Sequence, residues 1–223
     1  MTVNEMIYTA TTWAMPLLLS IIVHELAHGY VALWLGDRTA KDANRLTLNP
    51  LAHADIVGTI VLPLILFLSK APFLSGGAKP VPVSYGNLNN PRRDMGLVAL
   101  AGPVSNILLA IIFVLIGRGV MVFFEYNSPS ANWMMENVQN GVVFSLILAV
   151  FNLIPILPLD GGRVLLSLLP LKYAIKYQRV EPYGLFILMG FVFIPSLVGI
   201  NLIGWFLGTL FPYLYNFVML ITL

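Results

Sequence analysis

Residues 17–35 read LLLSIIVHELAHGYVALWL, an apolar run that contains His24, Glu25 and His28 near its centre. The run is long enough to cross a bilayer as a helix, which takes about 18 to 20 apolar residues. A charged side chain inside such a span costs about 2.5 to 3.5 kcal/mol on insertion scales and is functional by default. The stretch therefore predicts a transmembrane helix with a chemical function.

The two histidines are four residues apart, which places them one turn apart on the same face of a helix. At this spacing two imidazole nitrogens can bind one Zn²⁺, and Glu25 beside them is free to act on a metal-bound water. The alternative is a pair of core histidines bonded to backbone carbonyls, with Glu25 paired to an arginine. Because this H-E-x-x-H motif uses two of only three histidines in 223 residues, chance is a poor explanation for it.

Composition extends the membrane assignment to the whole chain. Of its 223 residues, 58% are hydrophobic and 10% are charged, whereas soluble domains have roughly 25% charged residues. A formal net charge of +2 argues against a broad basic surface of the kind that binds nucleic acid. The absence of cysteine excludes disulfides and thiolate metal ligands. Any metal must therefore be held by His, Asp or Glu. Partners are expected in the lipid bilayer, and residues 1–223 are expected to form a single membrane domain.

Apolar runs predict an all-α polytopic membrane protein with about five to six transmembrane helices. The runs are residues 8–35, 56–69, 97–124, 141–169, 183–198 and 201–220. The run at 56–69 has 14 residues, about 21 Å of helix, and is predicted to re-enter or lie at the interface rather than cross. Eleven of the twelve Lys and Arg then lie on one side, which the positive-inside rule makes cytoplasmic, and only Arg118 lies on the other.

The segment at 76–90 reads GGAKPVPVSYGNLNN and cannot form a helix, because its prolines alternate with valines between turn residues. It predicts a short membrane-associated β-hairpin, with a plain surface loop as the alternative. Backbone of this kind is tolerated near a membrane only where protein covers it or where it lines a wet cavity.

A third metal ligand is needed, because a catalytic zinc usually has three protein ligands and one open position. The best candidate is Asp160 in the stretch 152–163, which reads NLIPILPLDGGR and lies at the inner end of the fourth long run. Its depth matches that of the histidines, two prolines break the helix before it, and two glycines after it permit a tight backbone. The alternative is that Asp160 only pairs with Arg163 at the membrane surface.

Together these motifs resemble the site-2 protease family of intramembrane zinc metalloproteases. HELAHG at 24–29 is similar to the family's H-E-x-x-H helix, and NLIPILPLDGGR to its N-x-x-P-x-x-x-L-D-G motif, whose Asp is the third zinc ligand. AGPVSN at 101–106 looks like the family's Gly-x-x-x-Asn motif. AKPVPVS at 78–84 and NPRRD at 90–94 look like the β-loop region of compact members. The motif-bearing core is residues 8–169, and the C-terminal helices at 183–220 carry no motif.

The resemblance implies one Zn²⁺ per chain held by His24, His28 and Asp160, with Glu25 as the proton acceptor. It also implies that Asn152 lies beside the zinc, where it would donate to the scissile carbonyl or hold substrate backbone. The expected substrates are transmembrane proteins, cleaved within or next to their spans. The expected form is a compact member without a PDZ or CBS domain, in a prokaryotic cell membrane, with its active site toward the cytoplasm.

Two other polar residues are expected to have structural roles. Asn106 is a buried amide that would join helices by hydrogen bonds. His53 could bind a second metal or gate substrate, but bonding to backbone or lipid headgroups is the favoured interpretation.

Two other classes of protein could use the same residues. A transporter would use the His, Glu and Asp cluster as a metal or proton path, although the outer half of the first helix, WAMPLLLS at 13–20, offers no polar continuation. An inactive scaffold that binds membrane helices would tolerate the loss of Glu25. The sequence makes no prediction of substrate identity or oligomeric state.

Overall fold

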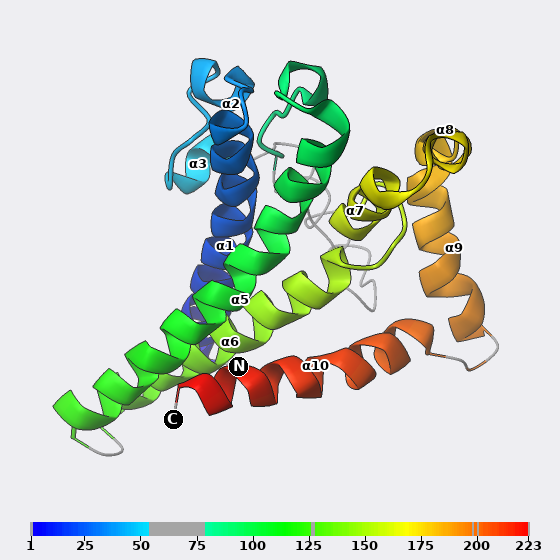
Figure 1. Ribbon diagram of the computed structural model, residues 1–223. Coiled ribbons are helices and arrows are strands. Elements are labelled where there is room, and N and C mark those ends of the chain that lie inside the picture. Colours follow the sequence, from blue (N-terminus) through cyan, green and yellow to red (C-terminus); the bar gives the residue numbers. More distant parts are fainter. Residues whose placement is uncertain (1, 54–78, 126–127, 198, 200, 223) are drawn as a thin grey trace.

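The computed structural model describes residues 2–53, 79–125, 128–197, 199 and 201–222, and Figure 1 shows this part of the chain as an assembly of helices. Within it, four helices are long and apolar enough to cross a membrane, namely α1 (Val3–Trp34), α5 (Pro91–Phe123), α6 (Pro129–Asn152) and α10 (Leu202–Ile221). The shorter helices are α2 (Thr39–Asp42), α3 (Pro50–His53), η2 (Tyr85–Asn87), α7 (Asp160–Leu168), α8 (Leu171–Gln178), η3 (Glu181–Tyr183) and α9 (Gly184–Leu197). The prediction of an all-α polytopic membrane protein is confirmed, because no strand is assigned within the described ranges.

The described residues contain four candidate spans, fewer than the five to six that the apolar runs predicted. The run at 141–169 divides, because α6 ends at Asn152 and α7 begins at Asp160, and Pro155 and Pro158 interrupt the helical backbone between them. Helix α9 has 14 residues, about 21 Å, which is short of the roughly 30 Å hydrocarbon core.

Helix α6 begins at Pro129, before the apolar run predicted from 141. Its polar first half is paired with α1. The Trp133 indole N–H donates to the Thr11 hydroxyl at 3.0 Å, and the Asn140 amide donates to the Thr12 carbonyl at 2.8 Å. Hydrogen bonds between helices satisfy these side chains inside the bundle, which hydropathy alone does not reveal.

The strap, defined as residues 79–89, leads into α5 and lies against the end of α1, where the Asn89 N–H donates to the Leu35 carbonyl at 2.8 Å. Residues 79–84 form no helix and no assigned strand, so the β-hairpin predicted at 76–90 is not confirmed in its described part. The predicted re-entrant run at 56–69 lies outside the described residues. The Lys79 N–H donates to the His53 carbonyl at 2.8 Å. The last described residue before the gap at 54–78 and the first one after it are therefore neighbours in space.

Asp37 holds the strap to the end of α1. Its side chain is buried, and its carboxylate accepts hydrogen bonds from the Thr39 N–H (3.0 Å), the Ser84 N–H (2.7 Å) and the Asn87 amide (3.2 Å). Burial raises the pKa of this carboxyl, but the donors stabilise the ionised form more strongly and hold the pKa of Asp37 below its ordinary value. The ionised carboxylate therefore stabilises the strap.

We expect the strap to loosen in acid. A carboxyl with a lowered folded-state pKa contributes stability that is complete above its unfolded pKa of about 3.9 and is lost as the pH falls through the folded pKa. Asp37→Asn should cost about 1 to 3 kcal/mol of unfolding free energy at neutral pH and flatten the acid dependence of the Tm in detergent. Asp42→Asn, a change at an exposed carboxylate nearby, is the matched control. Equal Tm values for the two variants would contradict this role of Asp37.

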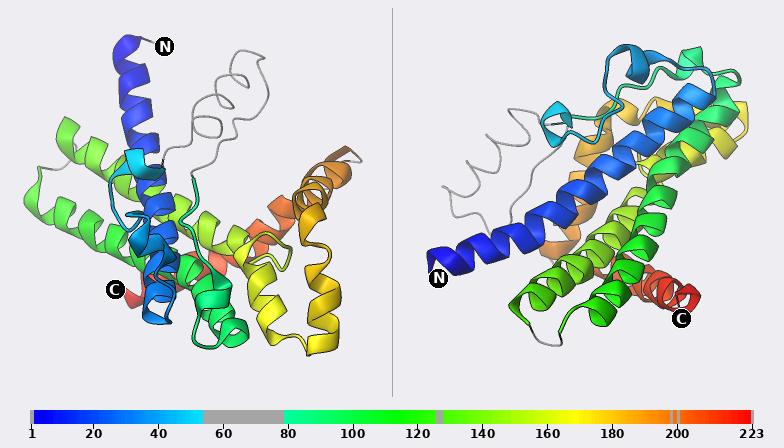
Figure 2. Two further views of the ribbon diagram at one scale, coloured as in Figure 1. Left: turned by 90° about the horizontal axis from the view of Figure 1, so that it is seen from above. Right: turned by 90° about the vertical axis from the view of Figure 1, so that its left-hand side faces the viewer.

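The core lies between α1, α5 and α6, and α10 crosses α5 and α6 (Figures 1 and 2). The buried side chains where α5, α6 and α10 meet are Leu109, Ala110, Phe113, Val138, Val142, Leu146 and Val218. Helix α7 also packs on α5, close to Gly96, where an added Cβ would lie 2.3 Å from the Ser167 hydroxyl. Helix α5 is therefore the common support for α1, which contains the histidines, and for α7, which begins with Asp160.

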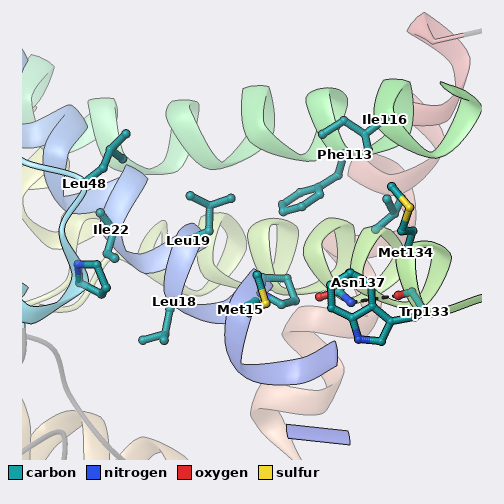
Figure 3. Close-up of a pocket in the computed structure, with 13 residues that line it drawn as sticks. Met15, Leu18, Leu19, Ile22, Leu48, Phe113, Ile116, Trp133, Met134 and Asn137 are labelled. Atoms are coloured by element: carbon teal, nitrogen blue, oxygen red, sulfur yellow. Dashed lines mark hydrogen bonds between the residues drawn. The ribbon is translucent and has the colours of Figure 1, made fainter. Parts of the chain in front are cut away.

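An apolar groove of about 430 Å³ opens between α1, α5 and α6 (Figure 3). Its lining includes Leu19, Ile22 and Phe113, and its polar exception is Asn137, whose amide donates to the Trp133 carbonyl at 2.9 Å. None of the metal-centre candidates His24, His28 and Asp160 is among the residues that line this groove.

Candidate metal centre

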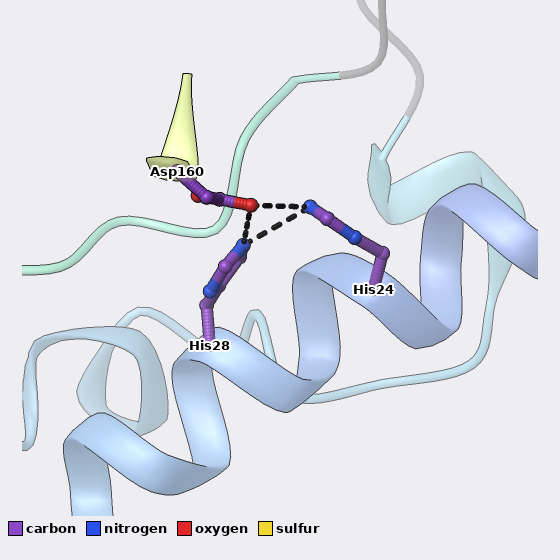
Figure 4. Close-up of side chains that lie close together, drawn as sticks. All are labelled: His24, His28 and Asp160. Carbon is purple, nitrogen blue, oxygen red and sulfur yellow. Dashed lines mark hydrogen bonds and ion pairs between the residues drawn. The ribbon is translucent and has the colours of Figure 1, made fainter. Parts of the chain in front are cut away.

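His24 and His28 project from successive turns of α1 toward Asp160, the first residue of α7 (Figure 4). Asp160 Oδ2 lies 3.1 Å from His24 Nε2 and 3.4 Å from His28 Nε2, and the two Nε2 atoms are 3.1 Å apart. These three residues form the one group of His, Asp and Glu in the described ranges that could hold a metal ion. The structure thus brings together all three predicted ligands.

The spacing of these atoms fits a tetrahedral zinc ion. With metal–ligand distances of about 2.0 to 2.2 Å, neighbouring ligand atoms of a tetrahedron are about 3.3 to 3.6 Å apart. The observed separations of 3.1 to 3.4 Å are close to this range. His24, His28 and Asp160 could therefore hold one metal ion.

His28 presents a ligand atom to this group. Its Nδ1 lies 2.7 Å from the Val98 carbonyl oxygen, which can only accept, so Nδ1 has the proton and the neutral ring presents a lone pair at Nε2. Asp160 Oδ2 is buried and lies within ion-pair distance of both Nε2 atoms. Two imidazole nitrogens and a carboxylate oxygen are donor types that zinc binds in proteins.

Asn106 orients the other imidazole. It is fully buried, and its amide nitrogen lies 3.2 Å from His24 Nδ1, while its Oδ1 has no partner within the described residues. When a metal occupies Nε2 of His24, Nδ1 has the proton, and turning the amide by 180° brings Oδ1 to accept it. The sequence predicts for Asn106 only a role in joining helices by hydrogen bonds. The signal for more was its position one helical turn after Gly102.

Gly102 allows α5 to approach the imidazoles. A Cβ at this position would lie 2.5 Å from His24 Cε1 and 2.6 Å from His28 Cε1. Both contacts are with rings that hydrogen bonds hold, His28 to the Val98 carbonyl and His24 to the Asn106 amide, so neither ring can move without losing its partner. The glycine is required by close packing.

We therefore expect Gly102→Ala to weaken zinc binding by at least about 10-fold, the lower end of the effect of altering residues behind metal ligands. Competition with a chromogenic chelator measures the affinity. Gly119→Ala is the matched control, because a Cβ on Gly119, in the same helix, would meet no atom within 4 Å. Equal zinc affinities for the two variants would show that the space at Gly102 does not matter.

Asp160 is placed by the packing of the residues around it. A Cβ on Gly161 would lie 2.2 Å from the Leu153 carbonyl oxygen, so the start of α7 fits against the preceding turn only because this residue is glycine. Arg163 pairs with Glu181 at 2.9 Å, and its guanidinium carbon lies 4.8 Å from the centre of the Tyr85 ring. The alternative in which Asp160 only pairs with Arg163 does not hold, because the arginine pairs with Glu181.

Glu25 lies beside the ligands, and its partner is not an arginine. Its Oε2 accepts a hydrogen bond from the Val81 N–H of the strap at 2.7 Å. The alternative that pairs Glu25 with an arginine is therefore wrong, although the accompanying expectation of a histidine bonded to a backbone carbonyl holds for His28.

Asn152 and His53, the other candidate site residues, are not members of the group formed by His24, His28 and Asp160. The Asn152 amide donates to the Leu148 carbonyl of its own helix at 3.1 Å. His53 is buried, and its Nε2 lies 2.8 Å from the Thr47 carbonyl oxygen, which agrees with the favoured interpretation of backbone bonding.

Comparison with known proteins gives a family match over most of the chain. Residues 12–195 match the model of peptidase family M50. The chain is 37% identical over 174 residues to "Putative zinc metalloprotease YwhC" of Bacillus subtilis (strain 168), covering 78% of this chain and 76% of that protein. It is 26% identical to Rip2 of Mycolicibacterium smegmatis, which has the same description, over 81% of this chain and 66% of the relative. "Zinc metalloprotease MJ0392" of Methanocaldococcus jannaschii is 25% identical over 76% of this chain and 38% of its own length. No solved structure matches.

Proposed function

The chain belongs to peptidase family M50, and from this premise we propose that it is an intramembrane zinc metalloprotease, which hydrolyses peptide bonds within or next to the membrane spans of other proteins. The observation that supports this most is the convergence of His24, His28 and Asp160, whose ligand atoms lie within 3.4 Å of one another. The histidines belong to a helix that is apolar enough to cross a membrane, so the reaction would take place at membrane depth.

The proposed reaction gives one task to each side chain. His24, His28 and Asp160 would hold the metal, and zinc, when bound, supplies an acidified water near neutral pH and a polarised scissile carbonyl. Glu25 accepts a proton from the attacking water and passes it to the leaving amine as the peptide C–N bond breaks. Because Oε2 of Glu25 already accepts the Val81 N–H, Oε1 is the atom that takes the proton.

Two further parts of the chain would hold the substrate. Asn152 would donate to the scissile carbonyl oxygen, for which its amide must exchange its present partner, the Leu148 carbonyl. The segment around Val81 and Val83 would accept the substrate as an added strand, after the substrate helix has unwound locally.

A pool of tagged single-span peptides with different apolar spans, reconstituted with the purified protein in liposomes, tests this proposal. We expect the zinc-loaded protein to cleave at least one member within or next to its span, the chelator-stripped protein to cleave none, and added Zn²⁺ to restore cleavage. Mass spectrometry of the fragments identifies the bond. Failure of the zinc-loaded protein to cleave any member would overturn the proposal. In that case zinc flux across the liposomes would indicate the transporter, and peptide binding alone the scaffold.

We further propose that the centre faces the cytoplasmic side of a prokaryotic cell membrane. In Figure 1, α2, the start of α5 and α8 lie toward one end of the long helices, and these elements contain Lys41, Arg92, Arg93, Lys172 and Lys176. Arg118 lies near the far end of α5. This distribution supports the orientation that the positive-inside rule predicts.

Single cysteines test this orientation. An impermeant maleimide applied from the cytoplasmic side should label Thr39→Cys, Ser84→Cys and Lys176→Cys, whereas Ser130→Cys should react only from the opposite side. The chain has no cysteine of its own, so the unsubstituted protein is the control. Labelling of Ser84→Cys from the same side as Ser130→Cys would contradict the proposed topology.

A further inference from the structure

The strap supplies a hydrogen-bond donor to the carboxylate of Glu25. The Val81 N–H donates to Glu25 Oε2 at 2.7 Å. Val81 stands between Pro80 and Pro82, which have no N–H, so it is the one backbone donor that these three residues can offer. We propose that Val81 is a positioning residue, whose N–H fixes the Glu25 carboxylate for proton transfer. This inference rests on the function proposed above.

The side chain of Val81 seats this donor against α1. It is 6% exposed and packs on Gly29, which lies one helical turn after Glu25 on the same face. A Cβ on Gly29 would lie 2.8 Å from Val81 Cγ1 and 2.5 Å from Leu46 Cδ2. The absence of a side chain at Gly29 therefore lets the strap come close enough for its N–H to reach Glu25.

Polar contacts hold the strap on both sides of Val81. The Arg45 guanidinium donates to the carbonyl oxygens of Lys79 at 2.8 Å and Pro80 at 3.3 Å. On the other side, the Ser84 N–H donates to the Asp37 carboxylate at 2.7 Å. The donor is thus held before substrate arrives, as preorganised catalytic groups are.

A fixed donor matters here because a glutamate side chain is flexible. A hydrogen bond from a backbone N–H to a carboxylate is charge-assisted and restricts the rotation of the group. With Oε2 held, Oε1 has a defined position relative to the metal ligands on the neighbouring face of α1. Misplacement of a reacting group by about 1 Å can cost about 10²-fold in rate.

Val81→Pro tests the inference, because it removes the N–H that Glu25 accepts. Gly86→Ala is the control for a change elsewhere in the strap, because a Cβ at Gly86 would meet no atom within 4 Å and Gly86 lies outside the segment proposed to accept the substrate. The probe is the best-cleaved peptide of the pool described above. We expect Val81→Pro to keep one zinc per chain and a KM within about twofold of wild type, and to lose at least about 10-fold in kcat. Gly86→Ala should stay within about twofold of wild type in kcat.

The Glu25→Gln background separates positioning from structural damage. If Val81 acts through the glutamate, Val81→Pro should change the residual rate of Glu25→Gln by less than about twofold, since residues that act as a unit are not additive. Should Val81→Pro fail to fold, an ester in place of the Pro80–Val81 amide deletes the same N–H and keeps the side chain.

Each outcome of this experiment has one meaning. Equal kcat values for Val81→Pro and Gly86→Ala would overturn the inference and leave the proposed function intact. The same fractional loss in the wild-type and Glu25→Gln backgrounds would also overturn it. If wild-type protein cleaves no peptide, the proposed function fails, and the inference that rests on it fails with it.

Discussion

His28→Ala is expected to purify with less than about a tenth of the zinc of the wild type and to lose measurable cleavage, because a catalytic zinc depends on three protein ligands. His28 Nε2 lies 3.4 Å from Asp160 Oδ2 and 3.1 Å from His24 Nε2, and alanine removes this corner of the group. Asp160→Ala should behave in the same way, since it removes the one carboxylate. Elemental analysis of the purified proteins measures zinc per chain.

His53→Ala is the control for general damage. His53 is buried, with 2% exposure, and its Nε2 lies 2.8 Å from the Thr47 carbonyl oxygen, away from the three ligands. Its loss removes a buried imidazole and a hydrogen bond without touching the group, so this variant should keep about one zinc per chain. Stoichiometric zinc in the His28→Ala, Asp160→Ala double variant would exclude the site, because only His24 would remain of the set.

The local part of the centre could be predicted from sequence because it depends on helix periodicity alone. His24 and His28 share a face at a spacing of four, and the structure places both Nε2 atoms together. Asp160 could not be predicted from periodicity. It was predicted from the helix break in the apolar run at 141–169, from the depth of its motif in the membrane and from the resemblance to a family. The structure places Asp160 beside the two histidines, where α6 ends at Asn152 and α7 begins at Asp160, and prolines and glycines have strong local effects on the backbone there.

Contacts between segments could not be predicted in the same way. Asn106 contacts His24, Val81 contacts Glu25 and Arg163 contacts Glu181 only because α5, the strap and η3 pack where they do. The pattern within a single segment does not specify its neighbours. The start of α6 was not predicted for the same reason. Its polar side chains form hydrogen bonds with α1, and a hydropathy pattern contains no information about such bonds.

Glu25→Gln is expected to lower turnover by about 10² to 10⁴-fold, the range ascribed to general acid–base catalysis, while zinc content stays unchanged. Glutamine keeps the size of the side chain, and its amide oxygen can still accept the Val81 N–H that Glu25 Oε2 accepts at 2.7 Å. The amide cannot take up a proton at neutral pH, so the variant separates proton transfer from zinc and substrate binding. Cleavage of the best peptide of the pool, compared at equal zinc occupancy, measures the effect.

Glu5→Gln is the matched control for this change. Glu5 belongs to the same helix, is exposed, and accepts the Thr2 N–H in the capping box at the start of α1, a position that glutamine also suits. It should cleave at the wild-type rate. A Glu25→Gln protein that cleaves as fast as Glu5→Gln would show that the proton acceptor is another group. Because His24, His28 and Asp160 would all be engaged with the metal, the hydrolytic mechanism itself would then have to be abandoned, and the scaffold or transporter alternatives would gain support.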